Sequence, residues 1–90
     1  MAKVKFTSAL NRFFPSLTEV EISGSTVKET LYNADKTYPG ILQYLVEEDG
    51  QLRKHVNIFV QGELIKDRVT LQDAVHGNDE LLIFQALSGG

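Results

Sequence analysis

Apolar and polar residues alternate in three stretches of the chain, and this period of two is typical of half-buried β-strands. The stretches are residues 2–7, 18–23 and 55–61. An apolar run at residues 80–87 predicts a fourth strand, and residues 64–65 predict a short fifth one. We expect the first two strands to pair as a hairpin across the loop at residues 8–16, and Gly24-Ser25 to close the second strand.

A helix is predicted from Thr26 to the breaker pair Pro39-Gly40. Thr26 and Glu29 have the spacing of a capping box, in which each side chain satisfies the other residue's free backbone amide. One face of this helix is apolar, and we expect that face to be core rather than binding surface. Its residues are Val27, Leu31, Ala34 and Tyr38.

The remaining segments predict short elements and turns. Residues 41–46 are apolar enough for a short helical turn or a buried loop, and residues 70–75 predict one helical turn capped by Thr70. The polar residues 47–51 predict a solvated loop, since nothing near their three carboxylates would drive the pKa values apart as an acid/base pair requires. Residues 76–79 predict a tight turn into the last strand.

This order of elements predicts an α+β domain in which one helix packs across a mixed sheet. A right-handed crossover would place the first and last strands side by side and parallel in the middle of that sheet. The last strand is then anchored in the core, and only the residues after it are free. We therefore expect residues 1–86 to form a single domain and residues 87–90 to form a flexible tail.

Composition narrows the classes of partner. Ninety residues support one core, and a net charge of −3 means that nucleic acid would be bound against long-range repulsion. A protein partner with a basic docking face fits better. No apolar run approaches the ~18 residues of a membrane span, and the N-terminus lacks the apolar segment of a signal peptide, so we expect neither a membrane nor a nucleic-acid partner, and a cytoplasmic location. The absence of cysteine excludes a disulfide framework, a thiolate zinc site and a cysteine nucleophile.

The last three residues, Ser88-Gly89-Gly90, follow the last predicted strand almost directly. A glycine pair passes through a narrow tunnel and turns at φ values that other residues avoid. Beyond a strand that ends near Ala86, four extended residues span at most ~14 Å, enough to reach a recessed pocket in another protein. The reactive group would then be the backbone carboxylate of Gly90, with no side-chain constellation required.

Taken together, the order of elements, the motif at residues 77–83 (Gly-Asn-Asp-Glu-Leu-Leu-Ile) and the ending at residues 86–90 (Ala-Leu-Ser-Gly-Gly) resemble the ubiquitin-like β-grasp sulfur carriers of the MoaD/ThiS family. The resemblance covers nearly the whole chain and is greatest to the small subunit of molybdopterin synthase and to the sulfur carrier of cysteine biosynthesis. It implies a mixed sheet of four to five strands packed on one main helix.

The resemblance also implies a two-step chemistry at Gly90. A ubiquitin-activating-type adenylating enzyme uses ATP to convert the carboxylate into an acyl-adenylate, and a persulfide or sulfide source then displaces AMP to leave a thiocarboxylate. A downstream synthase takes the sulfur into cysteine or methionine, molybdopterin or another metabolite. The carrier binds no cofactor or metal of its own, and Gly89, Ser88 and Leu87 supply the clearance of the tail. A protease that exposes Gly90 is a further candidate partner, because some relatives are made with extra residues after the glycine pair.

Aromatic and apolar residues outside the predicted core are candidates for the partner surface. We expect the outer face of the last strand, formed by Leu81 and Ile83 or by Leu82 and Phe84, to lie beside the tail and to dock the partner. Core packing and docking are both compatible with the three remaining candidates, which are Phe59, Phe13 and Phe14. His55 and His76 have no second ligand-type residue near them in the sequence and are interpreted as surface or turn residues.

Three functions are compatible with these features of the sequence. The first is a sulfur carrier, the second is a modifier joined through Gly90 to lysines of other proteins, and the third is a β-grasp interaction module that does not need its glycine pair. The sequence contains no nucleophile with a matching base and no phosphate-binding glycine loop. We therefore expect a carrier that is a substrate of partner enzymes, or the small subunit of an enzyme complex, and not an enzyme by itself.

Overall fold

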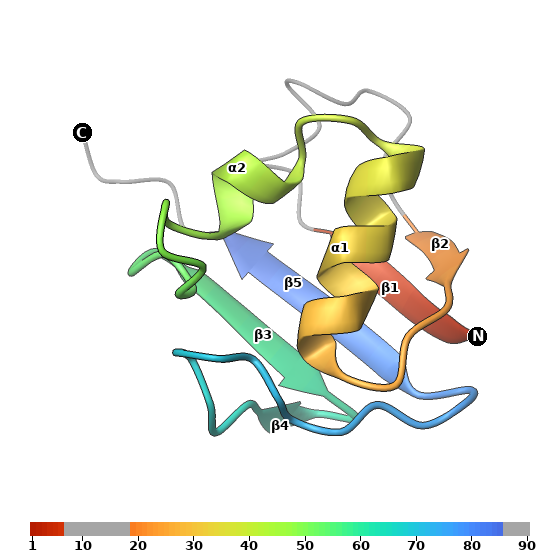
Figure 1. Cartoon of the computed structure of the whole chain (residues 1–90). Helices are drawn as coiled ribbons and strands as arrows, with labels where there is room; N and C mark the ends of the chain where they lie inside the picture. The colour runs from red at the N-terminus through yellow and green to blue at the C-terminus, as the bar shows by residue number, and fades with distance from the viewer. Residues whose placement is uncertain (7–18, 86–90) are drawn as a thin grey trace.

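The computed structural model describes residues 1–6 and 19–85, and these fold into one mixed sheet with two helices on one face (Figure 1). The strands are β1 (Ala2–Phe6), β2 (Glu19–Ile22), β3 (Val56–Val60), β4 (Glu63–Leu64) and β5 (Glu80–Gln85). The helices are α1 (Val27–Thr37) and α2 (Leu42–Leu45). The strand order is β2-β1-β5-β3-β4, which confirms the predicted β-grasp arrangement with one main helix.

The last strand lies in the centre of the sheet, as the sequence predicts. β5 pairs with β1 in parallel and with β3 antiparallel, so both of its edges are hydrogen-bonded. The register sets Val4 opposite Leu81 and Ile58 opposite Ile83. These four side chains are wholly buried against the helices, and they form the centre of the core.

Helix α1 begins and ends where its caps predict, with one difference. The Thr26 hydroxyl accepts a hydrogen bond from the Glu29 amide at 3.1 Å, but the Glu29 carboxylate accepts from the amide of Ser25, at 2.9 Å, rather than from that of Thr26. Val27, Leu31 and Ala34 are fully buried, and Tyr38 packs against the same core. The segment entering the helix needs glycine, because a Cβ at Gly24 would lie 2.2 Å from Oγ1 of Thr30.

The prediction of a helical turn at residues 70–75 is wrong. Leu71 has φ of 57°, which lies outside the right-handed helical region, and its buried side chain fills the core instead. The amides of Val69, Thr70 and Gln72 all donate to the carboxylate of Asp67, at 3.0, 2.8 and 3.2 Å. Asp67, and not Thr70, therefore organises this loop, because its carboxylate accepts the amide hydrogen bonds that hold the turn.

The short strand lies one residue earlier than predicted. β4 covers Glu63–Leu64, and Leu64 pairs with Phe59. The turn before β4 has positive φ at both Gln61 (52°) and Gly62 (82°), the geometry of a two-residue hairpin turn. This register turns the side chain of Leu64 to the surface, 51% exposed, and leaves Ile65 buried.

The predicted loop at residues 8–16 and the predicted tail at residues 87–90 lie outside the described residues. Among residues 1–6 and 19–85, no helix is long and apolar enough to cross a membrane.

Candidate functional site

The described part of the candidate site is β5 and the sheet face around it. Four of the predicted site residues, Leu87, Ser88, Gly89 and Gly90, lie outside the described residues, as do Phe13 and Phe14. The chain reaches them from Gln85, the last residue of β5. The strand that leads to these residues is therefore the central strand of the sheet (Figure 1). Its inward side chains, Leu81 and Ile83, lie in the core.

Side chains of β5 alternate between core and surface, and the alternation decides between the two predicted outer faces. Leu81 and Ile83 are fully buried, whereas Leu82 is 37% and Phe84 is 44% exposed. The face of Leu82 and Phe84 is thus the outer one. Phe59 lies on the same outer face, since it pairs with Leu82 and alternates with the buried Val56 and Ile58 of β3.

Leu64 of β4 lies on the same face, because it is the antiparallel partner of Phe59 in β3. Together the four side chains form a continuous group across β5, β3 and β4, which we call the apolar patch; its members are Phe59, Leu64, Leu82 and Phe84. The sequence analysis missed Leu64 because it placed the short strand one residue too late, and a shift of one residue reverses the face of a side chain. An exposed apolar group of this kind on a small protein is typical of a protein-binding surface.

On the β1 side the patch is bordered by a closed set of charges. The Nζ atom of Lys5, which pairs with Leu82 across the ladder, lies 3.2 Å from a carboxylate oxygen of Glu80 and 3.7 Å from one of Glu19. Lys5 and both acids are about half exposed. Surface pairs of this kind contribute little to stability, and with one lysine and two glutamates they leave this border of the patch with one net negative charge.

On the β3 side the patch is bordered by Arg68, which the sequence analysis did not single out. Its guanidinium donates through Nη1 to Oδ1 of Asn57 at 3.0 Å and through Nη2 to the carbonyl oxygen of Arg53 at 2.7 Å. Asn57 pairs with Phe84 across the ladder, so Arg68 lies at the end of β5 from which the chain continues to its tail. No local signal reveals this contact, since it joins a loop to a strand eleven residues away in sequence.

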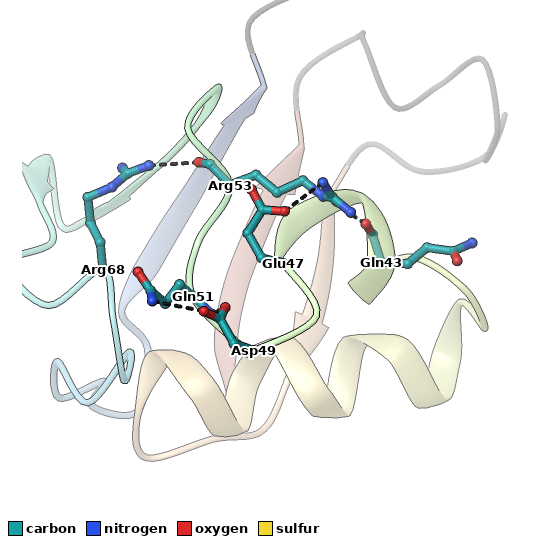
Figure 2. Close-up of polar contacts among 6 residues, drawn as sticks. All are labelled: Gln43, Glu47, Asp49, Gln51, Arg53 and Arg68. Carbon is teal, nitrogen blue, oxygen red and sulfur yellow. Dashed lines mark hydrogen bonds and ion pairs between the residues drawn. The ribbon is translucent and has the colours of Figure 1, made fainter.

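The helix side of the molecule holds an open groove of mixed polar and apolar lining between α1, α2 and residues 46–50. Arg53 donates to the carbonyl oxygen of Gln43 and pairs with Glu47, with 2.9 and 3.0 Å between the bonded atoms, and Asp49 accepts from Gln51 (Figure 2). Glu47, Glu48 and Asp49 are exposed, which confirms the predicted solvated loop. In Figure 2 the carboxylates of Glu47 and Asp49 bond to Arg53 and Gln51, which lie close to them in the sequence.

Among residues 1–6 and 19–85, one side chain, that of Asp67, has a clearly shifted pKa. The hydrogen bond from the Thr70 hydroxyl, and then those from the amides of Thr70, Gln72 and Val69, lower the pKa of Asp67 well below its usual range. This carboxylate shapes its own loop and lies outside the apolar patch. His55 and His76 are exposed, and residues 1–6 and 19–85 bring no three His, Cys, Asp or Glu side chains together as a metal-binding group.

Known structures share both the fold and the length of this chain. A chain of the BexX/CysO complex of Amycolatopsis orientalis is 27% identical, with a TM-score of 0.86 and full coverage of both chains. CysO of Mycobacterium tuberculosis is 25% identical, with a TM-score of 0.85, 97% of this chain covered and 100% of that one. Small archaeal modifier protein 1 of Methanosarcina acetivorans is 28% identical, with a TM-score of 0.77 and coverage of 99% and 95%.

Among curated proteins, none matches the sequence significantly. The family model described as the ThiS family matches residues 4–90, a range that includes all five strands except the first two residues of β1, and that continues to Gly90. Sheet order, the central position of β5 and the sequence match thus agree. The chain belongs to the ThiS family of ubiquitin-like β-grasp sulfur carriers.

Proposed function

We propose that this protein carries sulfur on the C-terminal carboxylate of Gly90. An ATP-dependent adenylating enzyme would join the carboxylate to AMP with release of pyrophosphate. Sulfide would then displace AMP to form the thiocarboxylate directly, or a protein persulfide would displace AMP to form an acyl disulfide, which a thiol would reduce to the thiocarboxylate while being oxidised to a disulfide. A biosynthetic enzyme that makes cysteine or methionine, molybdopterin or another sulfur-containing metabolite would take the sulfur and return the carboxylate. ATP belongs to the activating enzyme, and the carrier is its substrate.

The observation that carries this proposal is the family match that extends to Gly90, joined to a central strand that ends only five residues earlier. Because β5 is held on both edges, its end is a fixed point from which a short tail is presented. Gly89, Ser88 and Leu87 would cross the partner's surface, and the small side chains near the end would let the carboxylate enter a narrow site.

We propose the apolar patch as the surface that docks the adenylating enzyme. Its four side chains lie on the outer face of the strand that leads into the tail, so one partner would hold the patch and the terminus together. Exposed aromatic and leucine side chains at the centre of a contact contribute much of the binding energy when a partner removes them from water. The same surface would serve the sulfur acceptor in turn.

The decisive experiment is the intact mass of the chain after incubation with ATP, sulfide and the adenylating enzyme of its own organism. We expect a mass increase that matches replacement of one carboxylate oxygen by sulfur. The matched control lacks Gly89 and Gly90 and should gain no mass. Absence of the adduct with an enzyme that thiolates another carrier would reject the proposal in favour of an interaction module.

A second function has one specific observation in its favour, the 28% identity to a small archaeal modifier protein. A modifier would use the same acyl-adenylate, but an amine of a target lysine would displace AMP and form an isopeptide bond through Gly90. Incubation of the tagged chain in extract of its own organism with ATP distinguishes the two. Bands that contain the tag, that resist reduction by thiols and that disappear without the two glycines would establish conjugation.

A further inference from the structure

Arg68 is held in place by hydrogen bonds, but it forms no ion pair with an acidic side chain in the described part of the chain. Among residues 1–6 and 19–85 there are three ion pairs, Lys5 with Glu19, Lys5 with Glu80 and Arg53 with Glu47. Arg68 takes part in none of them, although the chain carries more acids than bases. Both of its recorded acceptors, Asn57 Oδ1 and the Arg53 carbonyl oxygen, are neutral.

These two hydrogen bonds hold the guanidinium in one orientation (Figure 2 shows the bond to Arg53). Arg68 is partly buried, and its two hydrogen bonds already restrict the rotamers of its side chain in the free protein. Binding to a partner therefore costs this side chain less additional conformational entropy. A guanidinium has five N–H donors, and the two recorded bonds leave donors for a carboxylate. An arginine fixed in this way binds a carboxylate at a smaller entropic cost than a lysine that is free in solvent.

The place of Arg68 relates it to the apolar patch. It donates to Asn57, which lies opposite Phe84, and its other acceptor immediately precedes the exposed Lys54. The patch thus has a border at Lys5, Glu19 and Glu80 that carries one net negative charge, and a positively charged residue, Arg68, at its opposite border. Aromatic and arginine side chains beside one another are the usual centre of a protein–protein contact.

We infer that Arg68 and Phe84 form a single docking point for a partner that carries a carboxylate beside an apolar side chain. The inference rests on the proposed function, since the partner it describes is the adenylating enzyme that docks on the patch. It also refines what net charge alone predicts. The net charge of −3 attracts a basic partner at long range. Near the C-terminal end of β5, however, Arg68 is suited to bind an acidic residue of that partner.

The test compares Arg68→Gln with Lys66→Gln, which removes one positive charge from an exposed side chain in the same loop. Binding of each variant to the adenylating enzyme is measured by calorimetry at low and high NaCl. We expect Arg68→Gln to weaken binding about tenfold or more and to reduce its salt dependence, and Lys66→Gln to change the Kd less than about twofold. Wild-type affinity in Arg68→Gln, or equal losses in the two variants, would overturn the inference.

Two further measurements keep the result interpretable. If urea unfolding shows that Arg68→Gln is not folded, Arg68→Lys replaces it in the test. Weaker binding of Arg68→Lys with unchanged salt dependence would support a carboxylate bound by two N–H groups of the guanidinium. Wild-type affinity of Arg68→Lys would overturn the inference. The effect of Arg68→Gln is also measured in the chain lacking Gly89 and Gly90. If it vanishes there, Arg68 binds the chain's own terminus and not the partner, and the inference is overturned.

Failure of the inference and failure of the proposed function give different results. If the enzyme thiolates the wild-type chain and the Arg68→Gln chain at equal enzyme and carrier concentrations below the Kd with the same rate, the carrier function stands and the docking point is rejected. If the enzyme thiolates neither chain but thiolates another carrier, the proposed function itself is rejected.

Discussion

Leu81 and Leu82 are identical neighbours on the same strand, yet Leu81 is fully buried and Leu82 is 37% exposed. The first lies under the helices with Val4 and Ile83, and the second lies on the open face with Phe59 and Phe84. Burial of the inner side chain stabilises the fold, whereas the outer one adds less to the fold and keeps apolar area available for a partner. The two faces of one strand thus separate stability from recognition.

The same substitution at the two positions gives the largest expected contrast. Leu81→Ala should lower the free energy of unfolding by about 2–5 kcal/mol, because it removes buried methyl groups and leaves a cavity in the core. Leu82→Ala should cost about 1–2 kcal/mol, since 37% of that residue is already in water and its removal leaves no enclosed cavity. Urea denaturation of both variants measures the difference, and equal losses would show that the outer face is part of the core.

The reverse contrast concerns binding. Phe84→Ala should weaken the complex with the adenylating enzyme by about tenfold or more, since it removes an aromatic side chain from the proposed docking surface. Tyr32→Ala is the matched control, because Tyr32 is exposed to a similar degree, 43% against 44%, but lies on helix α1. Calorimetric titration of both variants checks the prediction, which fails if Tyr32→Ala weakens binding as much as Phe84→Ala.

Low pH should destabilise the loop that Asp67 holds, and it should leave the conformation of the apolar patch unchanged. Hydrogen bonds from Thr70, Gln72 and Val69 lower the pKa of Asp67 in the folded protein, so the carboxylate holds its proton more weakly there than in the unfolded chain. The stability it contributes is therefore present above the unfolded pKa of about 3.9 and is lost as the pH falls below that value.

We expect the stability difference between wild type and Asp67→Asn to be constant from pH 7 down to about pH 5 and to shrink below about pH 4. Urea unfolding of both proteins from pH 7 to pH 2.5 provides the measurement. A difference that does not change with pH would mean that the Asp67 charge has no part in holding the loop. Binding of the partner at pH 7 should be retained in Asp67→Asn as far as the variant is folded.

The smallest expected effect is at the start of α1, the helix that covers the inner face. Thr26→Ala removes the side-chain acceptor of the Glu29 amide and should cost about 1 kcal/mol of unfolding free energy. Thr26→Ser keeps the acceptor and is the control. Thermal unfolding followed by circular dichroism compares the three proteins, and a loss in Thr26→Ser equal to that in Thr26→Ala would exclude the cap as the cause.

The alternating patterns predicted β1, β2 and β3, an apolar run predicted β5, and the caps predicted α1, because these signals are local and agree with the tertiary environment. Residues 70–75 failed for a physical reason. Their composition favours a helical turn, but Leu71 adopts φ of 57°, outside the helical region, and its side chain is buried in the core. The carboxylate of Asp67 holds this turn by accepting from the amides of Val69, Thr70 and Gln72. A side-chain acceptor upstream of a segment does not appear in the periodicity of that segment.

The candidate site divides in the same way. Strand alternation predicted the two faces of β5 but left open which one is outer, and it left Phe59 open between core and surface. The burial of Leu81 and Ile83 by the helices decides for the face of Leu82 and Phe84. Leu64 was missed through a shift of one residue in a strand of two residues. Arg68 was missed because its contacts with Asn57 and Arg53 join distant segments, and no local pattern encodes them.

The pairing of β5 also determines how the protein responds to mechanical force. The tail continues from a strand that is bonded in parallel to β1 on one edge and antiparallel to β3 on the other. A force applied along β5 from its C-terminal end would load the two rows of hydrogen bonds together in shear instead of opening them one at a time from an edge. Under the proposed function, an enzyme that drew the last residues into its active site would therefore pull on a strand that resists extraction, and the domain would stay folded.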